Sequence, residues 1–217
     1  LGGSSSINGM VYVRGNALDY DEWESHGAVG WNYQSCLPYF KKLEHHQCRT
    51  SEYTGKSGPV VVSGGNEMKN PLYKAFINAG VQAGYSETDD YNGFRQEGFG
   101  QKFMNVDNGV RASSSHAYLN KSTSRANLTV LKHTLVKRIL LEGKTAIGIE
   151  CKTKGKTRIF KANKEIIISA GSIGSPQLLQ VSGIGPADVL SRAGINLLHD
   201  LPGVGENLQD HLEFNFQ

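Results

Sequence analysis

The stretch EIIISAGSIGSPQLLQVSGIG, residues 165–185, joins a continuous apolar run to a turn rich in glycine and serine. The run that begins at Glu165 and ends in Gly171 is typical of a parallel strand buried on both faces. A helix is then expected to begin at Ser175. A strand that ends in glycine lets a ligand approach the backbone closely, as nucleotide sites at strand carboxyl ends require. The alternative is structural, because a helix start and a Ser-Gly helix end also explain the glycines.

Short runs rich in β-branched and apolar residues precede this strand. They cover residues 128–131, 135–141, 146–152 and 157–161, and Gly143 and Gly155 lie between the last three. Glycine at these places predicts hairpin turns, so the runs are expected to form a β-meander that leads into the buried strand. The fold class predicted from this order is mixed α/β (α+β).

The N-terminal half is predicted to be helical and irregular. A helix is expected to start near Asp19, and apolar residues at helical spacing predict another over Trp31–Glu44, with Pro38 in its first turn. A third is expected over Pro71–Ala83, ended by Gly84. Pro59–Ser63 is a strand candidate between the last two helices.

Composition excludes several classes of protein. The chain has 217 residues, 38% of them hydrophobic, and a net charge of +3 from scattered lysines and arginines, so a nucleic-acid partner is not expected. The three cysteines are far apart and include no CxxC pair, which favours a reduced intracellular setting. No apolar run approaches the length of a membrane span. Adjacent His45 and His46 lack further ligands at metal-binding spacing, so no metal site is expected.

Two other stretches carry dense polar chemistry. Gly2-Gly-Ser-Ser-Ser6 offers successive backbone N–H groups that could receive an anion, or it could be a flexible linker. Asn8 could face a heterocycle edge or cap the turn. The polar side chains of Pro202–His211 could line a site or tie down a loop.

Together the three stretches resemble the glucose–methanol–choline (GMC) family of FAD-dependent oxidoreductases. Gly2 to Asn8, followed by Tyr12, Gly15 and Asp21, resembles the first family signature without its leading residues. Residues 171–185 resemble the second signature without a gap. Residues 111–119 and 202–211 are also similar to the family, so the resemblance covers essentially the whole chain.

The resemblance implies the central part of a GMC-type FAD-binding domain together with part of the substrate domain. It assigns residues 1–45 to the FAD-binding loop and lid, 46–110 to the start of the substrate-binding region, 111–211 to the FAD-binding domain and 212–217 to the start of the substrate-domain sheet. The first βαβ unit of the family would precede Leu1, and its proton-accepting histidine would lie beyond Gln217. The chain is therefore expected to be a fragment that is inactive alone, and poorly soluble because its buried strand would lie at an open edge.

The resemblance also implies FAD as the cofactor. The residues expected to contact it are Gly2, Gly3, Ser4 and Ser5 at the pyrophosphate and flavin, Asn8 and Gly9 at the isoalloxazine edge, the backbone of Val136 at the adenine, and Ala170 and Gly171 at the adenosine. Ile7 stands where some relatives carry a histidine bonded to the flavin, so FAD is expected to bind non-covalently.

Within the family the chain is most similar to members that oxidise choline, through residues 8–16, 93–100 and 203–213. The resemblance implies oxidation of choline to betaine aldehyde, a step toward glycine betaine, by hydride transfer to flavin. Another primary alcohol as substrate, or a flavin-containing hydroxynitrile lyase, remains an alternative. Glu213 matches a glutamate that faces the trimethylammonium group in relatives, although it could also be a surface residue of an edge strand.

The implied partners are choline and an electron acceptor such as a membrane quinone. The implied location is intracellular: the cytoplasm, the periphery of the inner membrane, or the mitochondrion if the source is eukaryotic. No catalytic residue is assigned within the chain, because neither His116 nor His211 matches the proton acceptor of the family.

Overall fold

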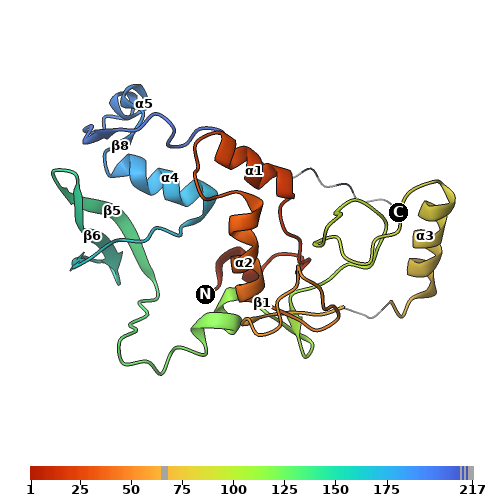
Figure 1. The fold of residues 1–217 in the computed structure, drawn as a ribbon. Coiled ribbons are helices and arrows are strands. Elements are labelled where there is room, and N and C mark those ends of the chain that lie inside the picture. The colour runs from red at the N-terminus through yellow and green to blue at the C-terminus, as the bar shows by residue number, and fades with distance from the viewer. Residues whose placement is uncertain (65–67, 211, 213, 215–217) are drawn as a thin grey trace. The chain divides into compact units, whose positions relative to one another are not determined.

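The structure is a computed structural model that describes residues 1–64, 68–210, 212 and 214. The chain divides into two compact units, Leu1–Leu128 (unit 1) and Thr129–Gln217 (unit 2) (Figure 1). Each unit is described by itself.

Unit 1 combines three α-helices with short strands. The helices are α1 (Ala17–Ser25), α2 (Tyr33–Leu43) and α3 (Pro71–Gln82), and the single turns η1 (Gly3–Ser6) and η2 (Ser115–Leu119) are 3-10 and π-helical. The strands are β1 (Glu44–His46) and β2 (Val60–Val62), which pair in parallel, and β3 (Val106–Asp107) and β4 (Val110–Arg111), which form a hairpin.

An asparagine caps the start of each α-helix of unit 1. The side chains of Asn16, Asn32 and Asn70 each accept a hydrogen bond from a backbone N–H of the first helical turn. These bonds satisfy donors that have no partner within the helix. The expected end of α3 is confirmed, since Gly84 follows it with a φ of +92°.

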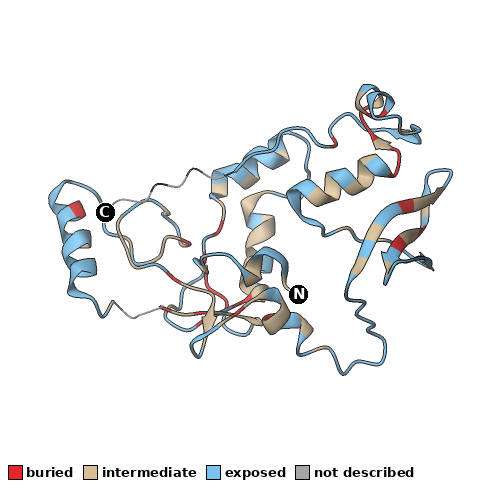
Figure 2. Ribbon diagram, turned by 180° about the vertical axis from the view of Figure 1, so that it is seen from behind, coloured by how far each residue is buried: buried red, intermediate tan, exposed pale blue. Residues whose placement is uncertain are grey.

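The core of unit 1 is small. Tyr12, Val62 and Phe103 form a buried cluster, against which Leu43 and Tyr91 pack. Coloured by burial, the ribbon shows short buried stretches among mostly exposed ones (Figure 2). The core therefore joins the N-terminal segment to β2 and to the segment before β3.

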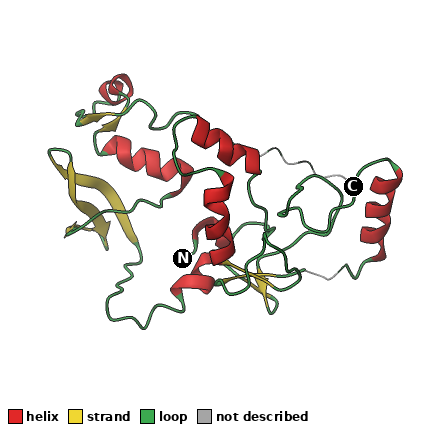
Figure 3. Ribbon diagram, in the orientation of Figure 1, coloured by secondary structure: helices red, strands yellow, loops and turns green. Residues whose placement is uncertain are grey.

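Unit 2 contains the expected meander. Strands β5 (Thr134–Glu142), β6 (Thr145–Thr153) and β7 (Lys156–Lys161) form an antiparallel sheet in the order β5-β6-β7. Gly143 and Gly155 lie at its turns with φ values of +57° and +78°, as predicted. Helix α4 (Gly171–Val181), strand β8 (Ile184–Gly185), helix α5 (Ala187–Arg192) and strand β9 (His199–Asp200) follow, and β8 pairs with β9 in parallel. Both units mix helices with strands, which confirms the predicted fold class (Figure 3).

The prediction of a buried parallel strand over residues 165–171 is wrong for the described structure. Residues 165–169 lie outside any strand, and the side chain of Ile167 is 79% exposed. The apolar run has the composition of a buried strand, but no described segment pairs with it. The helix that follows begins at Gly171 rather than at Ser175.

Two smaller expectations are also wrong. Residues 128–131 form no strand, because no described segment pairs with them. Pro38 lies in the second turn of α2, whose first residue is Tyr33, rather than in the first turn. Its ring removes one helical hydrogen bond there, while the Asn32 cap fixes the start of the helix.

Candidate functional site

The N-terminal turn, residues 2–9, is a compact loop held by its own backbone. Gly2 and Gly3 have φ values of +104° and +57°, which L-residues with a side chain rarely adopt. The carbonyl oxygen of Ser4 accepts the backbone N–H of Ile7 at 3.0 Å and that of Asn8 at 2.8 Å. No residue of η1 is buried, so the turn lies at the surface of unit 1.

Two side-chain groups of the turn bind residues far along the chain. Ser5 Oγ accepts the backbone N–H of Ser114 at 2.9 Å, and Asn8 Oδ1 accepts Arg111 Nη1 at 2.8 Å. The same Asn8 oxygen also accepts the backbone N–H of Met10 at 3.1 Å. Both side chains therefore shape the turn in this structure.

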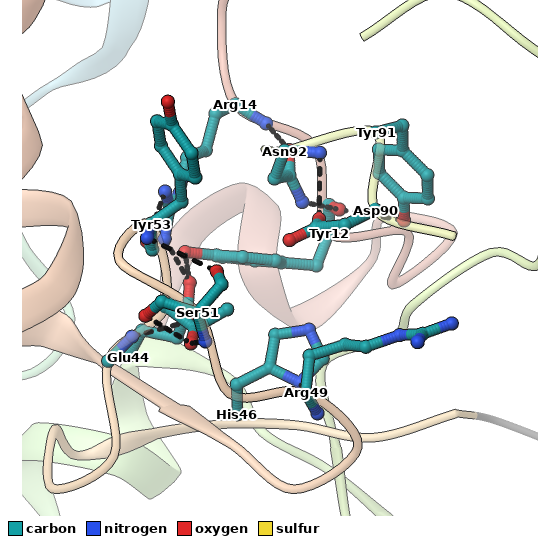
Figure 4. Close-up of polar contacts among 12 residues, drawn as sticks. Tyr12, Arg14, Glu44, His46, Arg49, Ser51, Tyr53, Asp90, Tyr91 and Asn92 are labelled. Atoms are coloured by element: carbon teal, nitrogen blue, oxygen red, sulfur yellow. Dashed lines mark hydrogen bonds and ion pairs between the residues drawn. The ribbon is translucent and has the colours of Figure 1, made fainter. Parts of the chain in front are cut away.

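A buried polar cluster includes two residues of the segment that follows the turn, Tyr12 and Arg14 (Figure 4). The carboxylate of Glu44 binds the guanidinium of Arg14, accepts the hydroxyl of Tyr12 at 2.7 Å and accepts the backbone N–H of Gly55 at 3.0 Å. Burial, together with the nearby charge of Glu44, raises the pKa of Tyr12 well above its usual value. The hydroxyl therefore stays a proton donor to Glu44 at physiological pH.

Further bonds tie this cluster to the loops around it. Arg14 Nη1 donates to the carbonyl oxygen of Tyr53 at 2.8 Å, and the backbone N–H of Arg14 donates to Asn92 Oδ1 at 2.8 Å. His46 is buried against the ring of Phe103, with centroids 4.6 Å apart, and desolvation lowers the pKa of its imidazole. The cluster thus positions residues 12–14, which continue directly from the N-terminal turn.

Unit 2 contains a groove of about 610 Å³ between β5, residues 166–170 and α4. Val136 and Ala170, two residues predicted to contact the adenosine part of a cofactor, both line it. Its walls are largely apolar and include Ile149, Ile166, Ile168, Leu178 and Val181. A flat aromatic ring is the kind of group that such a groove can hold.

The backbone beside Val136 departs from a regular strand. The register of β5 against β6 shifts between Val136 and Arg138, which is the mark of a β-bulge. Ser182 fastens the end of α4 to β5, because its Oγ accepts the N–H of Ile139 at 2.8 Å and donates to the Leu178 carbonyl at 2.6 Å. The groove is therefore built on a fixed strand–helix contact.

The other predicted site residues are placed as follows. Gly171 begins α4 with a φ of +87°, next to Ala170. Glu213 and His211 lie outside the described residues. Among the described residues no group of three or more potential metal ligands occurs.

Sequence reasoning missed the roles of four residues. Arg111 and Ser114 belong to a stretch that was noted only as similar to the family, and Arg14 and Glu44 were not singled out. Tyr12 and Arg14 alternate with exposed Val11 and Val13, which is a signal for a strand with one buried face. No local pattern indicates Glu44, which lies 30 residues from Arg14.

A search of the described helices finds none long and apolar enough to cross a membrane.

Comparison with known proteins relates the chain to flavin-dependent enzymes. It is 60% identical over 218 aligned residues to an oxygen-dependent choline dehydrogenase of Photobacterium profundum, covering all of this chain and 38% of that protein. It is 51% identical over 216 residues to the mitochondrial choline dehydrogenase of Homo sapiens, covering 36% of that protein. An FAD-dependent oxidoreductase from Chaetomium thermophilum superposes with a TM-score of 0.90 at 35% identity, over 95% of this chain and 38% of the other.

The chain thus spans well under half of the length of the relatives it matches. The sequence model of the GMC oxidoreductases matches residues 1–213. The chain belongs to the GMC oxidoreductase family.

Proposed function

We propose that this chain is part of an FAD-dependent choline dehydrogenase, which oxidises choline to betaine aldehyde as a full-length enzyme. The observation that carries the proposal is 60% identity over the whole chain to a protein named as an oxygen-dependent choline dehydrogenase. The human relative, at 51% identity, has the same activity in its name. The alternatives are oxidation of another primary alcohol and a flavin-containing hydroxynitrile lyase.

The described residues fit FAD at two places. In unit 2, the apolar groove that contains Val136 and Ala170 suits an adenosine group, with Gly171 beside it. In unit 1, the backbone N–H groups and glycines of residues 2–5 suit the pyrophosphate and flavin, and Asn8 and Gly9 suit the isoalloxazine edge. We propose that both places contribute to FAD binding in the full-length enzyme.

FAD is proposed to bind without a covalent bond at the N-terminal turn. Ile7 is 85% exposed and has a hydrocarbon side chain, which has no nucleophile to attach to a flavin. The bound cofactor would supply hydride acceptance, and the residues of this chain would hold and orient it. Acid precipitation of the full-length enzyme should release all its flavin into the supernatant.

Choline requires a particular kind of recognition. Its quaternary ammonium has no N–H to donate, so it is held by carboxylate attraction and by aromatic faces. We propose that Glu213 supplies the carboxylate. The exposed Glu206 offers a matched control, because it carries the same charge seven residues earlier.

The test uses the full-length enzyme with bound flavin under anaerobic conditions. Choline should bleach the flavin absorbance, and its uncharged isostere 3,3-dimethyl-1-butanol should do so much less efficiently. Glu213→Gln should lose most of the preference for choline, while Glu206→Gln should keep it. Absence of bleaching with both alcohols would favour the lyase, and equal bleaching by both would favour another alcohol as substrate.

We further propose that the electron acceptor is oxygen or a membrane quinone, the quinone being reached by peripheral contact with the inner membrane. The relative from Photobacterium profundum is named as oxygen-dependent, and the human relative is named as mitochondrial. The rate of reoxidation of the reduced enzyme by a soluble quinone and by dissolved oxygen should be compared. A faster reaction with oxygen would assign oxygen as the acceptor and contradict the quinone, and a faster reaction with the quinone would do the reverse.

A further inference from the structure

We propose that Arg111 is a positioning residue that pre-organises the N-terminal turn for FAD. This inference rests on the proposed function, since it concerns the site suggested for the flavin and pyrophosphate. Arg111 touches the turn and is not assigned a contact with the cofactor.

Arg111 binds the turn at three points. Its Nη1 donates to the Asn8 carbonyl at 2.6 Å, to Asn8 Oδ1 at 2.8 Å and to the Ser5 carbonyl at 3.3 Å. All three acceptors belong to the turn, and they lie more than 100 residues from Arg111 in the sequence. One guanidinium nitrogen therefore joins the two ends of the segment from Ser5 to Asn8.

The position of Arg111 is itself fixed by backbone pairing. It lies in β4 opposite Val106 of β3, and the N–H of the next residue, Ala112, donates to the carbonyl of Asn105 at 2.9 Å. The N–H of Asn105 in turn donates to the carbonyl of Met10 at 2.7 Å. The backbone of Arg111 is thus linked by hydrogen bonds, through Asn105, to Met10 in the segment after the turn.

The hydrogen bonds from Arg111 add to the order of a turn that has no buried residue, beside its own backbone bonds and the bond between Ser5 and Ser114. Its glycines, Gly2, Gly3 and Gly9, lose more conformational entropy on ordering than any other residue. No residue of η1 is buried, so apolar packing contributes little to holding it. A ligand that bound a loose turn would have to order it first, and this cost would weaken its affinity.

The hydrogen bonds from Arg111 order the turn and do not contribute to the core of unit 1. Arg111 is only half-buried, and the buried core of Tyr12, Val62 and Phe103 does not include it. Loss of the side chain should therefore loosen the turn and leave the core intact. This separation distinguishes positioning for a ligand from a general structural role.

The experiment compares Arg111→Met with Arg125→Met in the full-length enzyme. Arg125 is an exposed arginine of unit 1 whose side chain makes no hydrogen bond or ion pair with the described residues. FAD is removed and titrated back while its fluorescence is followed. R111M should bind FAD about tenfold to a hundredfold more weakly, the range expected for the loss of a charged hydrogen bond, and R125M should match the wild type.

Two further measurements separate positioning from folding. The thermal midpoint of the R111M apoenzyme should stay close to that of the wild-type apoenzyme, while amide hydrogen exchange over residues 2–9 becomes faster. R111K, which keeps the charge but lacks the planar fork, should recover part of the FAD affinity.

Three outcomes would overturn the proposal. They are FAD affinity of R111M equal to the wild type, an equal loss in R125M, and an R111M apoenzyme that melts well below the wild type or fails to fold. Each is distinguishable from failure of the proposed function, in which the wild-type holoenzyme itself would contain no FAD or would not be reduced by choline.

Discussion

Replacing Glu44 with leucine is expected to destabilise the structure around β1 by about 3–5 kcal/mol, the cost of leaving a buried charge without its partner. The side chain of Glu44 is 0% exposed and that of Arg14 is 3% exposed, so water cannot replace the lost carboxylate. The hydroxyl of Tyr12 and the N–H of Gly55 also lose their acceptor. The change therefore leaves the Arg14 cation without its counter-charge and two polar groups without an acceptor.

Local opening is measured by amide hydrogen exchange and mass spectrometry on the full-length enzyme. At 1.36 kcal/mol for each factor of ten, the expected loss corresponds to about 150-fold to 5,000-fold faster exchange where exchange follows local opening. The peptide of interest covers Gly58 to Val62, because the Gly58 N–H donates to the Glu44 backbone and β2 pairs with β1. The hydrogen bonds of this peptide do not include the Glu44 carboxylate. Faster exchange in the peptide therefore reports local opening of the structure and not the loss of the carboxylate itself.

A double-mutant cycle with Arg14→Met identifies the cause. Each single variant leaves one unpaired buried charge, whereas the double variant leaves none and should recover most of the lost protection. As a control, Asp188→Asn removes an exposed pair with Arg192 and should leave exchange unchanged. Additive losses in the double variant, or protection in Glu44→Leu equal to the wild type, would refute the buried-pair argument.

Three further predictions concern His46, the glycines of the N-terminal turn and the cysteines. Burial lowers the pKa of His46 below 6.5, so the unfolded state binds the imidazole proton more tightly than the folded state does. Protection of the amides around β1 from hydrogen exchange should therefore fall as the pH drops below 6.5, and it should fall less in His46→Asn. Gly2→Ala should reduce FAD retention more than Gly3→Ala, because a Cβ at Gly2 meets Ser6 Oγ and one at Gly3 meets nothing; equal losses would contradict this. Burial raises the pKa of the Cys151 thiol, so iodoacetamide should label exposed Cys48 first in peptide mapping; equal rates would disprove the difference.

Local signals in the sequence predicted the elements whose limits are set locally. The meander was predicted because Gly143 and Gly155 mark its turns, and the end of α3 because Gly84 can adopt a positive φ. The apolar run at Glu165 was mistaken for a buried strand because its burial depends on neighbouring segments. Composition shows that such a run is suited to burial, but it does not supply a pairing strand.

The residues that act across long sequence distances were not predictable from a local pattern. Arg111 meets Asn8 after 103 residues, and Arg14 meets Glu44 after 30. Each pair is joined by the fold, and neither has a characteristic spacing. The resemblance to the GMC family predicts Ser5, Asn8 and Val136 as site residues, but it does not predict the contacts that the structure shows around them.

The apolar lining of the groove in unit 2 makes the yield of soluble protein depend on the supply of the cofactor. Ile166, Ile167 and Ile168 line the groove on a segment that has no strand partner among the described residues. Unpaired backbone that carries apolar side chains promotes association between molecules. An adenosine group bound there would cover part of the same surface. We therefore expect cells that produce this chain with ample riboflavin to accumulate more of it in soluble form than flavin-starved cells, from the same amount of messenger RNA.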